Sequence, residues 1–305
     1  MNDPSGPGPT DPRAPDPARS FATVSDAYDR ARPTYPLEAV AWMTGRIPST
    51  VVEVGAGTGK LTDRLLELGH NVLATDPLDE MLQHLRRRHP DLRVATAPAE
   101  AVPVATRTVD TVVAGQAFHW FDTARALREA ARMLKPEGRI ALVWNHRDER
   151  IPWVRRLGSI IGSPREETDP TDVLVASRHF GYVETESFRH WQPMRRDDLR
   201  DLVTSRSNIA VMDPPARERV LRQVDDLYAE FDRGPDGLLL PYVTQCYRAV
   251  VRPRGLIEEP EHSADLTAAA NAVREARQRE VAEREAGSGK DDPDDGPSST
   301  LIDFR

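Results

Sequence analysis

The chain has 305 residues, of which 39% are hydrophobic and 30% charged, and its formal net charge is −8. No stretch approaches the ~18 consecutive apolar residues that a membrane-spanning helix needs, and the single cysteine, Cys246, excludes an internal disulfide. The negative charge lies mostly near the ends, because residues 252–305 carry −5 and residues 1–20 carry −1. There is no basic footprint for nucleic acid and no Cys/His cluster with zinc spacing, so we expect neither nucleic acid nor metal.

Residues 1–20 are predicted to form a disordered N-terminal tail. They contain six prolines among glycine, aspartate and serine, and they show no hydrophobic periodicity. Such a segment cannot bury enough apolar surface to offset its ordering entropy. It also lacks the basic and apolar blocks of a secretion signal, so we expect the protein in the cytoplasm.

Strand and helix patterns alternate over the next part of the chain. Leucines at helical spacing predict a helix that stops at Gly69, and two further helices are predicted to end at Pro90 and at residues 135–138. This alternation predicts right-handed crossovers and a parallel sheet. The strands come from short apolar or β-branched runs at residues 51–54, 71–75, 92–95, 109–114 and 139–144.

Beyond Asn145 the pattern is less regular. Strands around residues 182–191 and 239–250, with helices between them, would complete a mostly parallel sheet of seven strands. Cys246 falls in the last of these strands and is interpreted as a buried apolar residue. Residues 251–305 are predicted to form a flexible acidic tail, in which an Ala/Arg/Glu stretch has the composition of a solvated helix.

The glycine-rich segment at residues 53–60 directly follows the first strand. Glycines in this position let the backbone turn tightly and approach a ligand. A phosphate-binding loop would need glycine at Val54 and a hydroxyl at Leu61. The dinucleotide fingerprint would need its third glycine at Lys60. Both of these sites are therefore disfavoured by the observed spacing of Gly55, Gly57 and Gly59.

Two acidic residues accompany this loop: Glu53 precedes it and Asp76 ends the next strand. The pattern resembles class I S-adenosylmethionine-dependent methyltransferases. The resemblance implies a three-layer Rossmann-like α/β fold with an antiparallel last strand, and S-adenosyl-L-methionine as cofactor. Asp76 would accept hydrogen bonds from the ribose hydroxyls. The amino acid end of the cofactor would be held by Glu53 and the backbone of Gly55, Ala56, Gly57 and Gly59.

Further motifs resemble a narrower group of small-molecule methyltransferases that includes trans-aconitate methyltransferase. Residues 28–36 look like its Tyr…Arg-Pro-x-Tyr-Pro segment, residues 116–122 like its Ala-Phe-His-Trp-Phe signature, and residues 132–139 like its Leu-Lys-Pro-Gly-Gly stretch. The resemblance covers residues 21–250, which we expect to form the methyltransferase domain, and implies a small-molecule methyl acceptor. We expect Tyr28 and Gln116 beside the cofactor and Tyr35 beside the substrate, the two tyrosines forming a lid unless they only pack.

One departure from the family pattern concerns the adenine ring. Relatives often carry Gly-Asp-Ala-Glu after the third strand, and the aspartate reaches the adenine amino group. Here residues 97–100 read Ala-Pro-Ala-Glu, so Pro98 takes the aspartate position. Adenine would then depend on the amide of Ala99, on apolar packing and on Glu100. The alternative for Glu100 is a solvated loop carboxylate.

His119 and Trp120 follow the fourth strand, at the edge where open α/β sheets bind ligands. Trp120 would form a wall of the pocket and stabilise the sulfonium. The alternative for both side chains is that they pack the loop against the neighbouring helix. His119 is a candidate general base, although a carboxylate acceptor would need only a cation to position it. Arg32, and Arg147 after the fifth strand, are candidates for that cation, and a surface arginine is the alternative for each.

The sequence thus predicts methyl transfer to a small molecule, to oxygen in preference to nitrogen or carbon, with a carboxylic acid as the first expectation. The segment at residues 116–119 is not the Asp/Asn-Pro-Pro-aromatic loop of DNA amine methylation. Two alternatives stay open. One is a nicotinamide- or flavin-dependent oxidoreductase, and the other is an S-adenosylmethionine-binding regulator without turnover.

Overall fold

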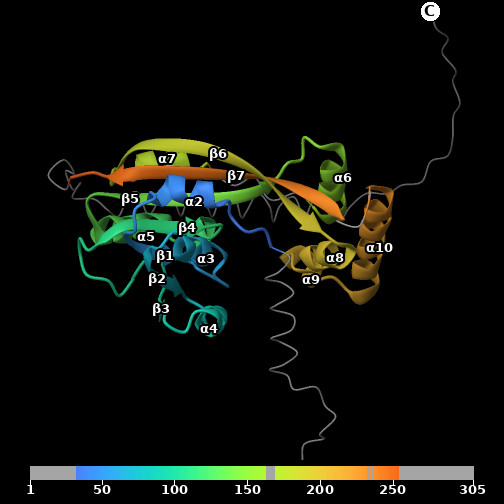
Figure 1. The fold of residues 1–305 in the computed structure, drawn as a ribbon, viewed down its shortest axis with the longest axis horizontal. Coiled ribbons are helices and arrows are strands. Elements are labelled where there is room, and N and C mark those ends of the chain that lie inside the picture. Colours follow the sequence, from blue (N-terminus) through green and yellow to red (C-terminus); the bar gives the residue numbers. More distant parts are fainter. Residues whose placement is uncertain (1–31, 163–168, 232–233, 235–236, 254–305) are drawn as a thin grey trace, which may run out of the picture. The chain divides into compact units, whose positions relative to one another are not determined.

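The computed structural model describes residues 32–162, 169–231, 234 and 237–253. Its strands are β1 (Thr50–Val54), β2 (Asn71–Asp76), β3 (Arg93–Thr96), β4 (Val109–Gly115), β5 (Leu134–Arg147), β6 (Phe180–Met194) and β7 (Leu238–Val251). They form a seven-stranded sheet in the order β3-β2-β1-β4-β5-β7-β6 (Figure 1). β1 to β5 pair in parallel, whereas β7 is antiparallel to both β5 and β6. The predicted fold and the antiparallel last strand are therefore confirmed.

The helices follow the alternation that the sequence predicts. They are α2 (Leu37–Thr44), α3 (Lys60–Glu67), α4 (Asp79–Arg88), α5 (Thr123–Met133), α6 (Pro152–Ile161), α7 (Pro170–Ala176), α8 (Arg196–Thr204), α9 (Ser207–Ala210) and α10 (Pro214–Phe231), with a short 3₁₀ helix, η1 (Phe118–Trp120). In the part of the chain that the structure describes, none of them is long and apolar enough to cross a bilayer. The predicted N-terminal tail, residues 1–20, lies outside the described residues. Of the predicted C-terminal tail, residues 251–305, only residues 251–253 are described, and Val251 belongs to β7 rather than to a tail.

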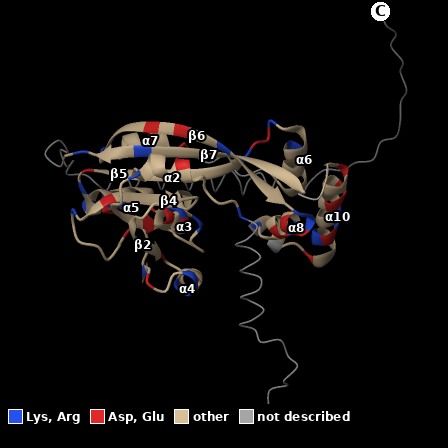
Figure 2. Cartoon of the chain, in the orientation of Figure 1, with Lys and Arg blue, Asp and Glu red and all other residues tan. Residues whose placement is uncertain are grey.

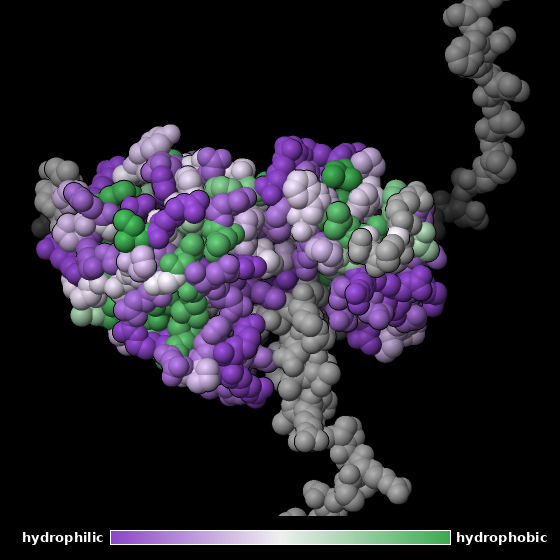
Figure 3. Space-filling view, viewed as in Figure 1, coloured by the Kyte–Doolittle hydropathy of each residue, from purple (hydrophilic) through white to green (hydrophobic). Residues whose placement is uncertain are grey.

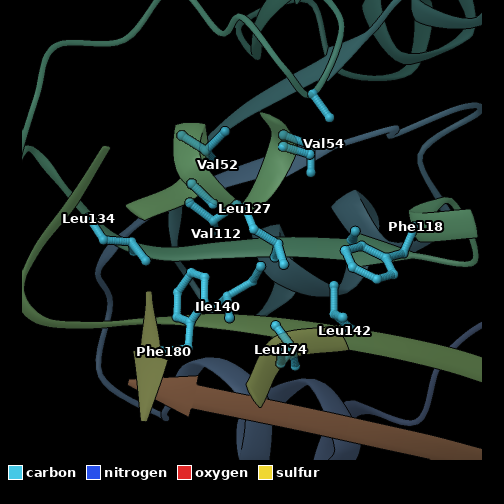
Figure 4. Close-up of a cluster of buried hydrophobic side chains, with 14 of the residues drawn as sticks. Val52, Val54, Val112, Phe118, Leu127, Leu134, Ile140, Leu142, Leu174 and Phe180 are labelled. Atoms are coloured by element: carbon cyan, nitrogen blue, oxygen red, sulfur yellow. The ribbon is translucent and has the colours of Figure 1, made fainter. Parts of the chain in front are cut away.

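Neighbouring residues of the central strands are buried on opposite faces of the sheet. Val51, Val113 and Ala141 pack with α2 and α3 in one cluster. The residues next to them in sequence pack with α5 and α7 in a second cluster (Figure 4), which includes Val52, Val112, Leu142, Leu127 and Leu174. Burial on both faces explains why these strands are nearly continuous apolar runs rather than alternating ones.

β5 differs from its predicted extent at both ends. The turn residues at 135–138 predict a loop and a strand that begins at Arg139, but the strand begins at Leu134, directly after α5. Leu134 pairs with Val109, and the register then shifts before Arg139 pairs with Thr111. Glu137 takes a positive φ of 66° there. The turn signals therefore mark an irregularity inside the strand. At its other end the strand includes Arg147, which the sequence predicts to lie after it.

The helices α6, α8, α9 and α10, which we call the helical cap, pack against the ends of β6 and β7. Their buried side chains form a core separate from the two clusters on the faces of the sheet. Leu157 of α6, Val203 of α8 and Leu227 of α10 are buried together with Leu240 and Tyr242 of β7. The outward surface of α8 and α10 is hydrophilic (Figure 3) and carries charges of both signs (Figure 2). Since Tyr242 pairs with Arg147, the cap core reaches the carboxyl end of β5.

The first prediction tests the placement of β6 at the edge of the sheet. Phe180 is fully buried and Tyr182, two residues further along β6, is 86% exposed. Phe180→Ala should therefore lower the free energy of unfolding by about 3–5 kcal/mol, because it leaves a cavity in the core. Tyr182→Ala should change it by less than ~0.5 kcal/mol. Urea unfolding of both variants makes the comparison, and equal losses would contradict the assigned strand.

Candidate active site

The loop between β1 and α3 is built from backbone that approaches its neighbours closely. Gly55 and Gly59 take φ values of 70° and 92°, in the left-handed region. A Cβ on Gly55 would lie 2.5 Å from the Cβ of Ala117, and one on Gly59 would collide with the side chain of Leu85. The loop therefore needs glycine for conformation and for space at both positions.

Asp76 ends β2 beside this loop and is buried, with 7% of its surface exposed. Its Oδ2 accepts a hydrogen bond of 2.9 Å from the amide of Gly57, and its Oδ1 accepts one of 2.9 Å from the amide of Leu78. A carboxylate offers about four acceptor positions. Asp76 thus holds the loop in place and keeps acceptor capacity for the two hydroxyls of a ribose.

Glu53 is a buried carboxyl under the loop, with 1% of its surface exposed. Burial raises its pKa to about 8; a 2.5 Å hydrogen bond from the Thr62 hydroxyl opposes the rise, and the negative charges of Asp63 and Asp76 add to it. A group in this state is ready to ionise when a cation arrives. The ammonium of an amino acid moiety fits that requirement.

Tyr35 and Gln116 lie against the end of β4. Tyr35 is 5% exposed, and a Cβ on Gly115 would lie 2.7 Å from its hydroxyl oxygen. Burial raises the pKa of Tyr35, the charge of Glu53 raises it further, and Arg32 and a hydrogen bond to the Gln116 side chain oppose the rise. Tyr35 is therefore a packed, protonated phenol near Glu53 rather than a surface lid. Gln116 has a strained φ of 53° while its amide donates to the Val143 carbonyl at 2.9 Å.

The segment that follows β3 is joined to the start of α5. Oε1 of Glu100 accepts a 2.7 Å hydrogen bond from the amide of Asp122, which is the N-cap of α5. One oxygen of Glu100 is thus bonded to the protein, and both interpretations of Glu100 stay open. Ala99 is buried in the same cluster as Val54 and Phe118. Contact of Ala99 and Glu100 with adenine stays a prediction.

His119 and Trp120 lie in η1 with ring centroids 4.9 Å apart. Desolvation lowers the pKa of His119 below its ordinary value, which favours the neutral imidazole, the form that accepts a proton. Trp120 is 80% exposed, which does not agree with the alternative that it packs against the neighbouring helix. Tyr28, which the sequence predicts to lie beside the cofactor, is outside the described residues.

Residues 32–36, which we call the leading segment, lie against the end of β5. Nδ2 of Asn145 donates to the carbonyl of Thr34 at 3.2 Å, and Arg32 lies two residues earlier, exposed. The side chain of Arg147 is only 7% exposed and lies 3.2 Å from Glu149. The surface-arginine alternative is therefore wrong for Arg147. The structure brings Arg147 to the edge that carries the glycine loop, as a buried cation.

Sequence reasoning missed two residues near Arg147. Tyr242 pairs directly with Arg147 across β5 and β7. Arg206 lies between α8 and α9. It is close enough to Arg147, Arg32 and Tyr242 for the charges of these residues to shift the pKa of Arg206. Neither residue belongs to a motif. Only the pairing of strands about 95 residues apart in the chain brings Tyr242 to this place, so no local signal was available.

Comparisons with known proteins point to one family. Residues 52–142 match a family described as "Methyltransferase domain". The chain is 42% identical over 235 residues to an uncharacterized methyltransferase of Mycobacterium tuberculosis, which covers 76% of this chain and 96% of that protein. It is 31% identical over 249 residues to an uncharacterized methyltransferase-like protein of Schizosaccharomyces pombe, with coverages of 77% and 96%.

A solved structure agrees with the fold. It belongs to a protein assigned as a type II methyltransferase from Anaeromyxobacter dehalogenans, with a TM-score of 0.50 and 24% identity, and it covers 72% of this chain and 96% of that chain. These likenesses do not confirm the narrower resemblance to the trans-aconitate group, which stays a prediction.

Glu53 predicts a specific pH dependence of stability. Between pH 4.5 and about 8 the unfolded chain releases the proton that native Glu53 keeps. The free energy of unfolding should therefore fall as the pH rises through this window, by up to roughly 1.4 kcal/mol per pH unit. Glu53→Gln, which keeps the shape and stays neutral, should flatten that slope.

Urea unfolding across this pH range measures the slope. Glu80→Gln is the control because Glu80 is exposed on α4. If Glu53→Gln and the parent chain showed the same slope, the buried neutral carboxyl would be disproved.

Proposed function

Because the chain belongs to the class I S-adenosylmethionine-dependent methyltransferases, we propose that it transfers the methyl group of S-adenosylmethionine to an oxygen atom of a small molecule. The observation that carries the proposal is the buried Arg147 at the same sheet edge as the Asp76–Gly57 contact. Arg147 is suited to orient an anionic acceptor, and the Asp76–Gly57 contact is suited to hold a nucleoside. With the family established, the oxidoreductase alternative is abandoned.

The residues present fit the cofactor. Asp76 has spare acceptors for a ribose diol, and Glu53 is a buried carboxyl whose raised pKa suits a cationic partner. We assign the amino acid end to Glu53 and the glycine backbone, and the adenine to Ala99, with Glu100 at its edge. Gln116, beside Tyr35, would contact the methionine part.

The cofactor supplies a methyl group on a cationic sulfur, which departs as a neutral thioether, so the leaving group needs no acid. The chain's own task is alignment. Holding the attacking oxygen in line with the methyl group is worth roughly 7–11 kcal/mol in well-oriented systems. Arg147 and Arg32 would orient an anionic acceptor, and Tyr35, on the leading segment, would border it.

The need for a base depends on the acceptor. A carboxylate attacks as an anion and would need none, whereas a hydroxyl would lose its proton during the reaction. His119 lies just after β4 and its pKa is lowered by desolvation, so we assign it as the base that takes this proton if the acceptor is a hydroxyl. Trp120 beside it would shield the sulfonium.

A methylation screen tests the proposed function. The full chain is incubated with methyl-labelled S-adenosylmethionine and fractionated cell extract, and the labelled products are separated by size and by stability to alkali. We expect a low-mass, alkali-labile product, as a methyl ester would be. Label that appears only in protein or nucleic acid would contradict the small-molecule acceptor, and absence of any label would favour the regulator without turnover.

Asp76 offers the sharpest test of the cofactor assignment. Asp76→Ala should weaken S-adenosylmethionine binding by about 1–3 kcal/mol, because the ribose hydroxyls lose their acceptor at a buried site. Calorimetric titration measures this affinity. Asp91→Ala, an exposed aspartate before β3, is the control and should bind as the parent does. An Asp76→Ala protein that is folded and binds with unchanged affinity would remove Asp76 from the ribose site.

A further inference from the structure

Three polar side chains form a row across β5, β7 and β6. Arg147 pairs with Tyr242, and Tyr242 pairs with His190 on its other side. Directly paired residues of antiparallel strands project from the same face of the sheet. The rings of His190 and Tyr242 are stacked, with centroids 5.4 Å apart and an interplanar angle of 16°. A guanidinium, a phenol and an imidazole thus stand side by side at the carboxyl end of β5.

The helical cap adds a second guanidinium to this row. Arg206 is anchored by a 3.0 Å hydrogen bond from Nη2 to the carbonyl of Gly162. Val203 and Ile209, on either side of it in sequence, are buried in the same core as Tyr242. Burial lowers the pKa of Arg206, and the positive charges of Arg147 and Arg32 lower it further. The two guanidiniums are therefore partly desolvated and repel one another.

The hydrogen-bonding capacity of this cluster is not used up. In the part of the chain that the structure describes, Nε of Arg147, Nε of Arg206 and Nε2 of His190 are buried and have no hydrogen-bond partner. Buried donors without an acceptor are costly and uncommon. Glu149 forms an ion pair with Arg147 at 3.2 Å. Its one negative charge is outnumbered by the three positive charges of Arg147, Arg206 and Arg32.

We infer that Arg147 and Arg206, supported by Tyr242 and His190, form a subsite for a carboxylate group of the acceptor that is not itself methylated. An acceptor carboxylate would satisfy the unpaired Nε–H donors of the two arginines and relieve the repulsion between the guanidiniums. The inference rests on the proposed function, because it assigns one part of the acceptor. It defines the substrate class as small molecules that carry an anionic group in addition to the attacked oxygen.

The chemistry of the transfer explains why this group is not the one that reacts. As a carboxylate attacks the methyl group, it loses its negative charge. Two guanidiniums on the attacking oxygen would bind the reactant more tightly than the transition state and would slow the reaction. Held on a remote carboxylate, the same pair contributes equally to both states, and its binding energy positions the acceptor. Arg206 is thus a specificity-determining residue.

The experiment uses succinate as the probe, with the full chain saturated by S-adenosylhomocysteine so that the cofactor site is filled and no turnover occurs. Calorimetry should detect succinate binding and weaker binding of succinamide, its neutral counterpart. Arg206→Gln should weaken succinate binding at least about tenfold. Arg156→Gln is the control, since Arg156 is an exposed cap residue paired with Glu230 at 2.7 Å, and it should bind succinate as the parent does.

Two results would overturn the inference. One is a parent protein that binds S-adenosylhomocysteine but takes up succinate no better than succinamide, and the other is unchanged succinate affinity in Arg206→Gln. Retained S-adenosylhomocysteine binding shows that each variant is folded. If the parent itself fails to bind S-adenosylhomocysteine, it is the proposed function that fails instead.

Kinetics with the acceptor from the methylation screen provide a second readout. Arg206→Gln should raise KM roughly tenfold and leave kcat nearly unchanged, as loss of an interaction made equally in reactant and transition state does. A fall in kcat at constant KM would instead mean that Arg206 acts on the reacting oxygen, contrary to the inference.

Discussion

The hydrogen bond between the Gly57 amide and the Asp76 carboxylate is the contact on which the rest of the site depends. It joins the ends of β1 and β2, which run in parallel with Val54 opposite Thr75. Parallel strands deliver their carboxyl ends to one edge, so a loop and a carboxylate from separate strands meet there without any long connection. Gly55 and Gly59 let the loop follow its path between β1 and α3, because side chains at these positions would collide with Ala117 and Leu85.

Around that contact lie two kinds of buried or half-buried ionisable group, a carboxyl under the loop and guanidinium groups at the helical cap. Burial raises the pKa of Glu53 under the loop to about 8, while the guanidinium groups of Arg147 and Arg206 lie near one another at the helical cap. The leading segment connects the two regions, since Tyr35 packs near Glu53 and the Thr34 carbonyl is bonded to Asn145 of β5. In the proposed function, cofactor and acceptor would be recognised by separate groups along one edge of the sheet, and the reacting atoms would meet between them.

The part of this arrangement that depends on local pattern could be predicted from the sequence. The central strands are short apolar runs, and the spacing of the glycines before Asp76 was enough to identify the family and the cofactor. The extent of β5 was not predictable, because Glu137 and Gly138 carry turn signals yet lie within a bulged strand. Tyr242 and Arg206 were missed for a different reason. Their positions follow from strand register and cap packing between segments distant in the chain, and single residues carry no sign of either.

The most direct measurement of the central claim is a pair of calorimetric titrations of the unmodified chain, one with S-adenosylmethionine and one with NAD. A glycine backbone and carboxylate arranged for a nucleoside without phosphates should give saturable heat with S-adenosylmethionine and none with NAD. Saturable binding of NAD together with no response to S-adenosylmethionine would contradict the account.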